Sequence, residues 1–412
     1  MPWPRQALID LLGIEHPIIQ APMAGASTAA LAAAVSNAGA LGGFGGTDSS
    51  PDELREVIRA IRHMTDKPFI INLYLDRTEP YVPVVEHEAA LKTALAPVHA
   101  ELHAGEVPNP VDLFGKFDSQ VAVVLEEYVP VLSSHFGAPD ASVMRALKAN
   151  GTRVIATATT VGEARHLASA GVDAIIAQGA EAGGHRGTFA APVEQSQIGT
   201  MALVPQIVDA VSVPVIAAGG IMDGRGIAAA LMLGASGVQM GTAFVPCPET
   251  GANPAYVRRL LSAAPGDAIL TDVVSGRAAR LLRNRLVNLL EQHRGHRLAF
   301  PEQHSMTRNL RKAASATDNA EFLPMWAGQG VMLTRAMPAA ALVESLVAEA
   351  QNLLSYSLAS TPAVRDRAPR ANRSTESPVV RPSARKRQRR VQRARRHHQD
   401  NVSQDALESD DE

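Results

Sequence analysis

Eight short apolar runs alternate with stretches of helical periodicity from Pro17 to Phe244 of this 412-residue chain. Such runs are typical of fully buried strands, and helical connections are what parallel strands need. The runs are residues 17–21, 39–44, 68–74, 129–135, 152–158, 173–178, 213–219 and 237–244. Eight strands joined mostly by helices predict an α/β protein built on a TIM (β/α)8 barrel, with an open doubly wound sheet as the alternative.

The composition agrees with that class and argues against secretion or membrane insertion. The chain is 46% hydrophobic but only 4% aromatic, so aliphatic side chains must build the core. Residues 226–245 carry no charge, but glycines and polar residues interrupt them, and a barrel helix followed by a strand explains them better than a membrane span. The single cysteine, Cys247, excludes an internal disulfide, and charges interrupt the N-terminal apolar residues. We therefore expect a cytoplasmic protein.

Two segments interrupt the strand–helix rhythm. Residues 76–128 contain helical material, and residues 248–350 include RAARLLRNRLVNLLEQ, which has the periodicity of an amphipathic helix. We expect residues 1–75 and 129–247 to form the barrel. The two interrupting segments then form a smaller helical domain that lies over the mouth of the barrel like a lid.

Residues 360–412 have the composition of a disordered tail, rich in Pro, Ser and Arg with an acidic end. From Arg365 onward the tail contains 13 Lys+Arg and 8 Asp+Glu. A solvated tail is the favoured interpretation, because short basic motifs often have no binding role. The alternative is a weak contact with an anionic surface or a nucleic acid through ARKRQRRVQRARR.

One histidine stands out as a candidate for chemistry. QGAEAGGHRG, residues 178–187, follows the sixth apolar run and places His185 behind a glycine pair, on a loop at a strand end where α/β enzymes keep reactive side chains. Imidazole changes protonation within the physiological range, so we expect His185 to be the catalytic proton-transfer group. His135, at the end of the fourth run, is the competitor. The spacing of His, Asp, Glu and Cys predicts no metal site.

Two glycine-containing strand ends indicate a phosphate-bearing cofactor. Gly219 and Gly220 lie at the end of the seventh run, and we expect QMGT, residues 239–242, to end the eighth strand. Loops after strands seven and eight of a barrel often bind phosphate through backbone N–H groups that small residues leave accessible. GALGGFGG, residues 39–46, lacks the GxGxxG spacing and predicts no dinucleotide site.

Three further strand ends carry residues suited to a flat heterocycle. QAPMAGAST places the polarisable Met23 between Pro22 and Ala24 after the first run. Asn72, at the end of FIIN in the third run, and Gln178, at the end of the sixth run, carry amides that can both donate and accept hydrogen bonds.

These motifs together resemble the class I nitronate monooxygenases, formerly called 2-nitropropane dioxygenases. The segments that carry the resemblance are QAPMAGAST, INLYL, AQGAEAGGHRG and PVIAAGGIMDGRGIAAALMLGASGVQMGTAF, with SGRAARLLRNR and MWAGQ downstream. The resemblance implies an FMN-binding TIM barrel that oxidises alkyl nitronates, such as propionate 3-nitronate, with O2 to a carbonyl compound and nitrite. It places His185 on the family's catalytic histidine. The FMN-binding residues that it implies are Pro22, Met23, Ala24, Asn72, Gln178, Gly183, Gly220, Gln239, Met240, Gly241 and Thr242.

Two other functions remain open on sequence grounds. Flavin-dependent enoyl-acyl-carrier-protein reductases, which use NAD(P)H, have a closely similar EAGGH motif, although AGGHRG and MWAGQ favour the monooxygenase. A non-catalytic flavoprotein, tethered to nucleic acid by the basic tail, is the third possibility. The sequence indicates no oligomeric state.

Overall fold

The computed structural model describes residues 2–75, 81–111 and 116–359. The expected tail, residues 360–412, therefore lies outside the described residues. Among the described helices, none combines the length and the hydropathy that crossing a bilayer requires.

Eight parallel strands form a closed barrel. They are β1 (Ile18–Gln20), β2 (Gly42–Gly45), β3 (Phe69–Tyr74), β4 (Val131–His135), β5 (Arg153–Ala158), β6 (Ala174–Gln178), β8 (Val215–Ala218) and β9 (Gly237–Met240). They pair in the order β1-β9-β8-β6-β5-β4-β3-β2. A parallel bridge between Ile19 and Leu41 joins the two ends, with backbone N–O distances of 2.9 Å from Gln20 to Leu41 and from Leu41 to Ile18. The expected TIM barrel is confirmed, and the open sheet is excluded.

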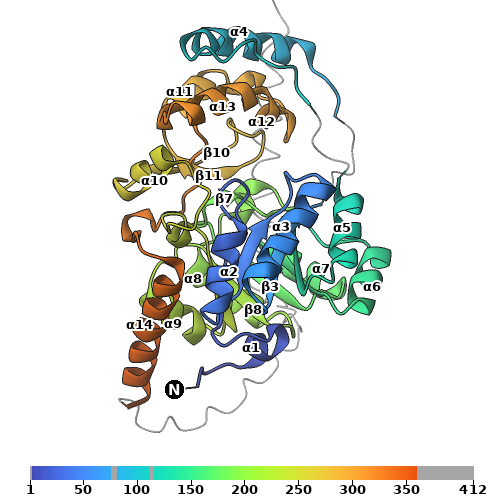
Figure 1. The fold of residues 1–412 in the computed structure, drawn as a ribbon, viewed down its shortest axis with the longest axis vertical. Coiled ribbons are helices and arrows are strands. Elements are labelled where there is room, and N and C mark those ends of the chain that lie inside the picture. The colour runs from blue at the N-terminus through green and yellow to red at the C-terminus, as the bar shows by residue number, and fades with distance from the viewer. Residues whose placement is uncertain (1, 76–80, 112–115, 360–412) are drawn as a thin grey trace, which may run out of the picture. The chain divides into compact units, whose positions relative to one another are not determined.

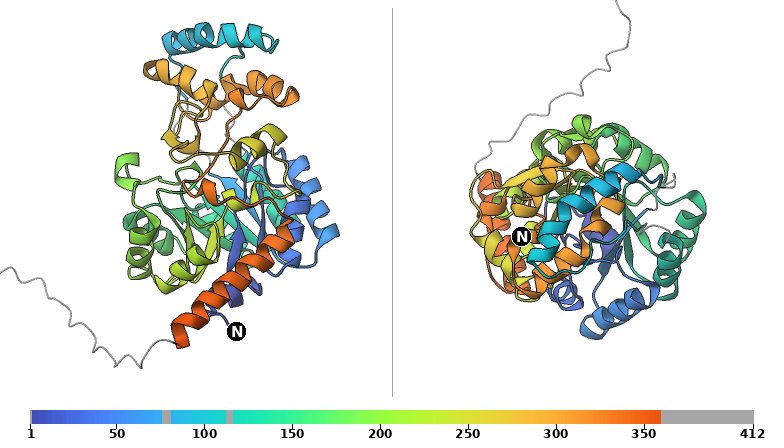
Figure 2. Two further views of the ribbon diagram at one scale, coloured as in Figure 1. Left: turned by 90° about the vertical axis from the view of Figure 1, so that its left-hand side faces the viewer. Right: turned by 90° about the horizontal axis from the view of Figure 1, so that it is seen from above.

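Helices surround this barrel on its outside (Figures 1 and 2). They are α2 (Ala29–Asn37), α3 (Pro51–Met64), α5 (Phe117–Glu126), α6 (Ala141–Ala149), α7 (Val161–Ser169), α8 (Thr200–Val208), α9 (Gly224–Met232) and α14 (Ala339–Ala359). Several of these helices begin where a side chain accepts a hydrogen bond from a backbone N–H group. In α3, Ser50 and Glu53 accept from each other's N–H groups in a capping box. Each such cap stabilises its helix by about 0.5–2 kcal/mol.

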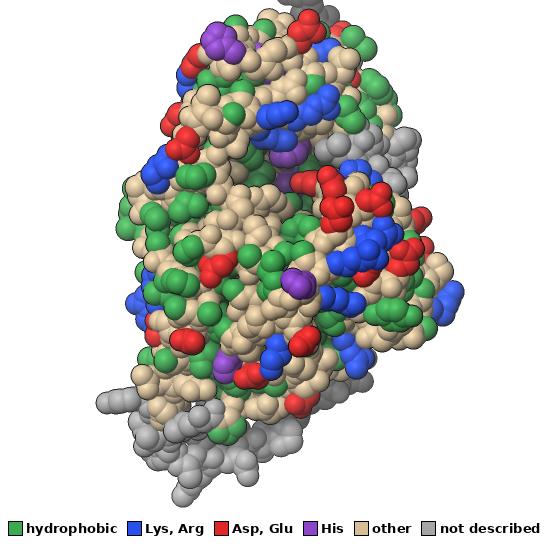
Figure 3. Space-filling view, in the orientation of Figure 1, with side chains coloured by type: hydrophobic (Ala, Val, Ile, Leu, Met, Phe, Trp, Pro, Cys, Tyr) green, Lys and Arg blue, Asp and Glu red, His purple; other side chains and the backbone are tan. Residues whose placement is uncertain are grey.

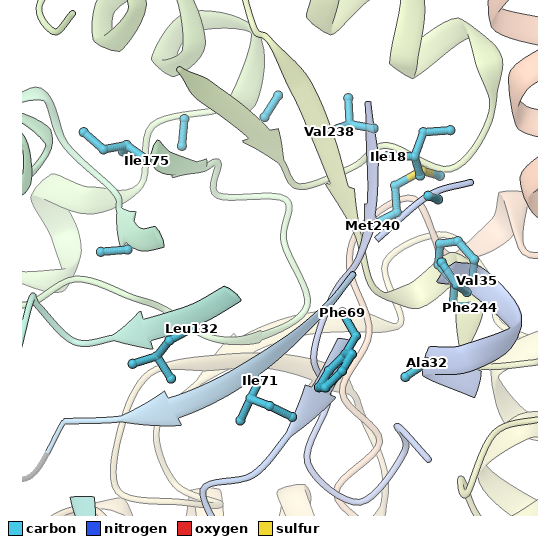
Figure 4. Close-up of a cluster of buried hydrophobic side chains, with 14 of the residues drawn as sticks. Ile18, Ala32, Val35, Phe69, Ile71, Leu132, Ile175, Val238, Met240 and Phe244 are labelled. Carbon is cyan, nitrogen blue, oxygen red and sulfur yellow. The ribbon is translucent and has the colours of Figure 1, made fainter. Parts of the chain in front are cut away.

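Alternation along the strands divides the apolar side chains between two sides of the sheet. Ile70 and Ile176 lie in the cluster inside the barrel, whereas their neighbours Ile71 and Ile175 belong to the core between sheet and helices (Figure 4). Leu8, from α1 (Ala7–Leu12), joins the inner cluster. α1 thus closes the amino-terminal end of the barrel strands. Open space remains at the opposite end, where the strands have their carboxyl ends.

A second hydrophobic core, here called the second core, lies over those carboxyl ends (Figure 1). It includes Leu91 and Leu95 and residues between Val245 and Val331. Its elements are α4 (Val85–Glu101), α10 (Pro254–Leu261), β10 (Ala268–Thr271), β11 (Ala279–Leu282), α11 (Arg285–Gln292), α12 (Glu302–Met306) and α13 (Arg308–Ala316). A three-stranded antiparallel sheet, β10-β11-β7, joins it to the two-residue strand β7 (Gly184–His185) of the barrel loop.

The structure corrects two local expectations. RAARLLRNRLVNLLEQ is not one helix: residues 279–282 form β11, because they pair on both edges and are buried throughout, and tertiary packing overrides helical periodicity. The expected strand over residues 237–244 ends at Met240, and Thr242–Phe244 is a 3₁₀-helix.

Two helices of the interrupting segments cover the barrel rather than its mouth. In α5, Phe117 and Val121 belong to the core between sheet and helices, and the helix packs against α3 and α6. In α14, Leu342 and Leu346 belong to the same core, and the helix packs along α9 and α2. The material over the barrel mouth is therefore smaller than residues 76–128 and 248–350.

The glycines of GALGGFGG serve packing. A Cβ added at Gly42 would lie 1.8 Å from the carbonyl oxygen of Ala32, and one at Gly43 would lie 2.7 Å from that of Gln20. Both contacts are with backbone atoms, so α2 and β1 can approach β2 only where side chains are missing.

We expect Gly42→Ala to lower the free energy of unfolding by about 1–3 kcal/mol or more, because the new methyl group overpacks backbone that cannot move aside. Chemical denaturation measures this loss. Gly295→Ala is the matched control, since no atom lies within 4 Å of the added Cβ there. Equal stability of the two variants would contradict the packing role of Gly42.

Candidate active site

A cavity of about 670 Å³ lies between the carboxyl ends of the barrel strands and the second core. Its volume is within the range of about 300–1,000 Å³ that small-molecule sites occupy. Every residue that the sequence suggested for the site lines it. These residues are Pro22, Met23, Ala24, Asn72, Gln178, Gly183, His185, Gly220, Gln239, Met240, Gly241 and Thr242.

Aromatic rings enclose His185 in this cavity. The ring centroids of Phe300 and Trp326 each lie 5.1 Å from the imidazole, and that of Tyr74 lies 6.1 Å away. Burial, followed by the electrostatic effects of His135 and Arg277, lowers the pKa of His185 to about 3. The imidazole is therefore neutral throughout the physiological range, rather than titrating within it as the sequence suggested.

The loop that carries His185 is held to the end of β6 by hydrogen bonds. Gln178 Nε2 donates to the His185 carbonyl oxygen at 3.0 Å, while Gln178 Oε1 accepts from Arg186 at 3.0 Å and from the Gly187 N–H at 2.8 Å. Both ends of the Gln178 amide are thus engaged with the loop, whereas the sequence suggested an amide that contacts a heterocycle. In this arrangement Gln178 positions His185.

Arg186 is completely buried beside this loop. Its guanidinium also donates to the carbonyl oxygens of Gln178, Gly179 and Ser196, at 2.6–3.0 Å. Burial lowers its pKa to about 10, so the side chain stays cationic. A buried cation needs such a set of acceptors, and this requirement fixes the backbone around it.

Glu163 binds the residues that follow Arg186 in the chain. Its carboxylate accepts hydrogen bonds from Thr159, two residues before α7 begins, and from the Thr188 hydroxyl at 2.8 Å. It also accepts from the N–H groups of Phe189 and Ala190 at 2.7 and 3.0 Å. These hydrogen bonds lower the pKa of Glu163 against the opposing effect of burial. The His185 loop is therefore anchored on both sides.

His135 has no free basic nitrogen in this site. Its Nε2 lies 3.3 Å from the His185 carbonyl oxygen and must donate to it, because a carbonyl only accepts. Its Nδ1 then accepts from the Thr157 hydroxyl at 3.2 Å. Burial lowers the pKa of His135 to about 4. Since the pKa of His185 is lowered further still, it is the hydrogen bonding of both His135 nitrogens, not the pKa, that leaves His185 as the better candidate base.

The residues present fit a phosphate-bearing heterocycle. Gln239 Oε1 is buried at the cavity wall with no hydrogen-bond partner among the described residues, so it can accept an N–H from a ligand. Gly220 and Gly241 line the cavity without side chains and leave their backbone accessible. Asn72 donates to Ser133 through its amide nitrogen, which leaves its oxygen as an acceptor.

Cations outnumber acids along the cavity. Lys116, Arg308, Arg311 and Lys312 line it, against the single acid Asp48 among the described residues. Lys and Arg side chains lie next to histidines at the hollow where the second core meets the barrel (Figure 3). Such a wall favours an anionic ligand.

Several lining residues were missed by sequence reasoning. Phe300, His304 and Arg311 come from α12, α13 and the segment before them, and Arg311 donates to His304 Nδ1 at 2.6 Å. No motif spacing links them to the strand ends. Trp326 was noted only as part of MWAGQ. The pattern of apolar and basic residues in α13 was the one sequence signal for these positions. Taken alone, that pattern indicates an amphipathic helix with an exposed basic face, not a site.

The fold and the cavity define a class of protein. In barrel enzymes the active site lies at the carboxyl ends of the strands, where this chain has a half-buried neutral histidine and accessible backbone on the last two strand loops. The sequence profile of nitronate monooxygenases matches residues 5–349. The chain belongs to the nitronate monooxygenase family, whose members are flavin-dependent oxidoreductases, and it is therefore an enzyme.

Relatives and solved structures agree with this family. The chain is 47% identical over 343 residues to a nitronate monooxygenase of Pseudomonas aeruginosa, covering 82% of this chain and 97% of the relative. It is 45% identical over 350 residues to one from Paraburkholderia phytofirmans, covering 84% and 95%. Nitroalkane oxidase from Streptomyces ansochromogenes has a TM-score of 0.77 at 39% identity, over 85% of this chain and 99% of that one. FabK from Thermotoga maritima has a TM-score of 0.67 at 34% identity, over 85% and 98%.

We expect acid to destabilise the protein through three histidines. The pKa values of His135, His185 and His304 are lowered by burial, to about 4, to about 3 and well below the usual value. Below pH about 6.5 the histidines bind protons in the unfolded chain but not in the native state. The free energy of unfolding therefore decreases by at most about 1.4 kcal/mol per histidine for each pH unit by which the pH is lowered.

Urea denaturation of the apoprotein between pH about 7.5 and about 5 measures this slope. His304→Gln should flatten it, while His166→Gln, at an exposed position, should not. A slope that is the same in both variants would show that His304 does not contribute.

Proposed function

We propose that this enzyme binds FMN and oxidises alkyl nitronates with O2 to carbonyl compounds and nitrite, with propionate 3-nitronate as a test substrate. The observation that carries the proposal is the neutral His185, enclosed by aromatic rings in a cavity whose wall holds four cations and one acid. Both the cofactor phosphate and a nitronate are anions, and a cationic wall attracts both.

The cofactor proposal rests on the strand ends. In this proposal the backbone at Gly220, Gly241 and Thr242 binds the phosphate, and the side-chain oxygens of Asn72 and Gln239 accept hydrogen bonds from the ring system. Pro22, Met23, Ala24, Gln178, Gly183 and Met240 complete the proposed FMN site. When bound, the flavin supplies the electron transfer to O2, and the protein supplies binding, orientation and electrostatics.

His185 acts on the substrate in this proposal. It orients the nitronate anion in the cavity, or it removes the α-proton when the substrate is a neutral nitroalkane. Tyr74, Phe300 and Trp326 surround it and keep water away, which strengthens the electrostatic interactions of the site. The second core acts as a lid, because it supplies Phe300 and Trp326 from above the barrel mouth.

The cellular setting is part of the same proposal. Cys247 is buried and its thiol pKa is raised to about 12, so it is inert and suits a reducing compartment. We infer a cytoplasmic location. Any contact of the basic tail with anionic surfaces concerns residues outside the described ones.

We expect His185→Asn to keep the flavin but to lose about 10²–10⁴-fold in turnover, the usual contribution of a general acid–base group. Oxygen consumption and nitrite release with propionate 3-nitronate measure turnover, and visible absorbance measures flavin content. His166→Asn, at an exposed site, is the control. Turnover close to that of the wild type would remove His185 from the mechanism.

The reductase alternative is tested with the same preparation. NADH and a crotonyl thioester replace the nitronate, and NADH absorbance is followed without O2. NADH loss in this assay, together with no nitronate turnover, would reassign the enzyme as an enoyl thioester reductase, in line with its likeness to FabK.

We expect the apoprotein to bind FMN at least about tenfold more tightly than riboflavin, because even one charged hydrogen bond to phosphate contributes about 1.5–3 kcal/mol. Quenching of flavin fluorescence during titration measures both affinities. Equal affinities would place the phosphate outside the protein, and tighter binding of FAD would assign the larger cofactor.

A further inference from the structure

Ser275 contacts His185 from outside the proposed FMN site. It lies on the loop between β10 and β11, is 1% exposed, and does not line the cavity. Its Oγ is 2.9 Å from His185 Nε2 although the two residues are 90 positions apart in the chain. Nε2 therefore points at the wall, and Nδ1 is the ring nitrogen left for a ligand.

The hydroxyl of Ser275 has only one proton to donate. The structure assigns that proton to the carbonyl oxygen of Arg277, which lies 3.0 Å from Ser275 Oγ and can only accept. Ser275 Oγ consequently accepts from His185, and the proton of the neutral imidazole is on Nε2. Nδ1 carries the free lone pair.

A rigid turn holds Ser275 in this role. Gly276 has a φ of +89°, and a Cβ there would lie 2.4 Å from the carbonyl carbon of Ala299. The Gly276 N–H donates to the Asp272 carbonyl at 2.8 Å, and its carbonyl oxygen accepts from Arg297 at 2.9 Å. The turn brings the Arg277 carbonyl back to the Ser275 hydroxyl.

The side chain of Arg277 continues this connection back to the site. Its guanidinium lies 3.7 Å from the centroid of the Phe136 ring and donates to the Thr188 carbonyl. The Thr188 hydroxyl also donates a hydrogen bond to the Glu163 carboxylate. The serine turn and the His185 loop are thus fastened to each other at two separate points.

We propose that Ser275 is a positioning residue that fixes His185 in the Nε2–H tautomer and makes Nδ1 the atom that accepts the substrate proton. The inference rests on the proposed function for its chemistry. With a neutral nitroalkane, the α-C–H bond breaks, the proton goes to Nδ1, and the electron pair of that bond enters the nitro group to give the nitronate. The imidazolium keeps its Nε2–H on Ser275.

The tautomer itself is the first measurement. In ¹H–¹⁵N long-range spectra of the histidine-labelled apoprotein, assigned with His185→Asn, we expect a pyridine-type Nδ1 and a pyrrole-type Nε2 for His185. Ser275→Ala should abolish this single state and give averaged or inverted shifts, and Ser275→Thr, which keeps the hydroxyl, should restore it. A pyrrole-type Nδ1 in the wild type would overturn the proposal.

Turnover gives the second readout. We expect Ser275→Ala to lose about 10–100-fold in kcat with flavin content unchanged, by analogy with the groups that orient metal-binding histidines through their second ring nitrogen. Ser275→Thr should recover most of this loss, and the exposed Ser262→Ala should equal the wild type. Wild-type kcat in Ser275→Ala would overturn the functional part of the inference.

Failures of the two proposals are distinguishable. A wild-type enzyme that never oxidises nitronates contradicts the proposed function, while the spectra still decide the tautomer. If Ser275→Thr does not fold, the wild-type and Ser275→Ala spectra decide alone. A wild-type Nε2–H state that persists unchanged in Ser275→Ala would show that Ser275 does not fix it.

Discussion

Closure of the barrel is the constraint on which every other feature depends. Backbone hydrogen bonds between β1 and Leu41 join the sheet to itself, and the inner aliphatic cluster, sealed by α1, fills one end. Closure brings strand ends far apart in the chain onto one ring. Pro22, Asn72, His135 and Gln178 share a cavity for that reason alone.

Within that ring, buried charge organises the chemistry. Arg186 and Glu163 are both taken out of water, and each must be surrounded by hydrogen-bond partners or it would cost several kcal/mol. Several of those partners are backbone groups of residues 178–196, the segment that carries His185. Arg186 and Glu163 therefore hold the loop in place, and the loss of their partners would destabilise the fold. The fixed loop also keeps a neutral imidazole beside cations.

The barrel and the strand-end part of the site were predictable, because strand periodicity and chain order determine which residues meet at a carboxyl end. The rest was not. RAARLL has helical periodicity, yet pairing with β10 and β7 makes Ala279–Leu282 a strand, and only that pairing brings Ser275 to His185. Arg311 and Phe300 reach the cavity through packing of the second core, which no local pattern encodes. The direction of the Gln178 amide depends on Arg186, which is buried. Arginine is usually exposed, so its burial here could not be predicted from the residue type.

Strand β7 has a consequence for how such an enzyme can diversify. His185 is hydrogen-bonded to the end of β6 in the barrel and, through β7, also pairs with β11 in the sheet of the second core. Cofactor contacts proposed at the strand ends and substrate contacts from above therefore meet at one two-residue strand. Substitutions in the second core that leave β11 in place also leave His185 in place, but any change that shifts β11 shifts the histidine with it. The position of this histidine therefore depends on the barrel and on the second core at once.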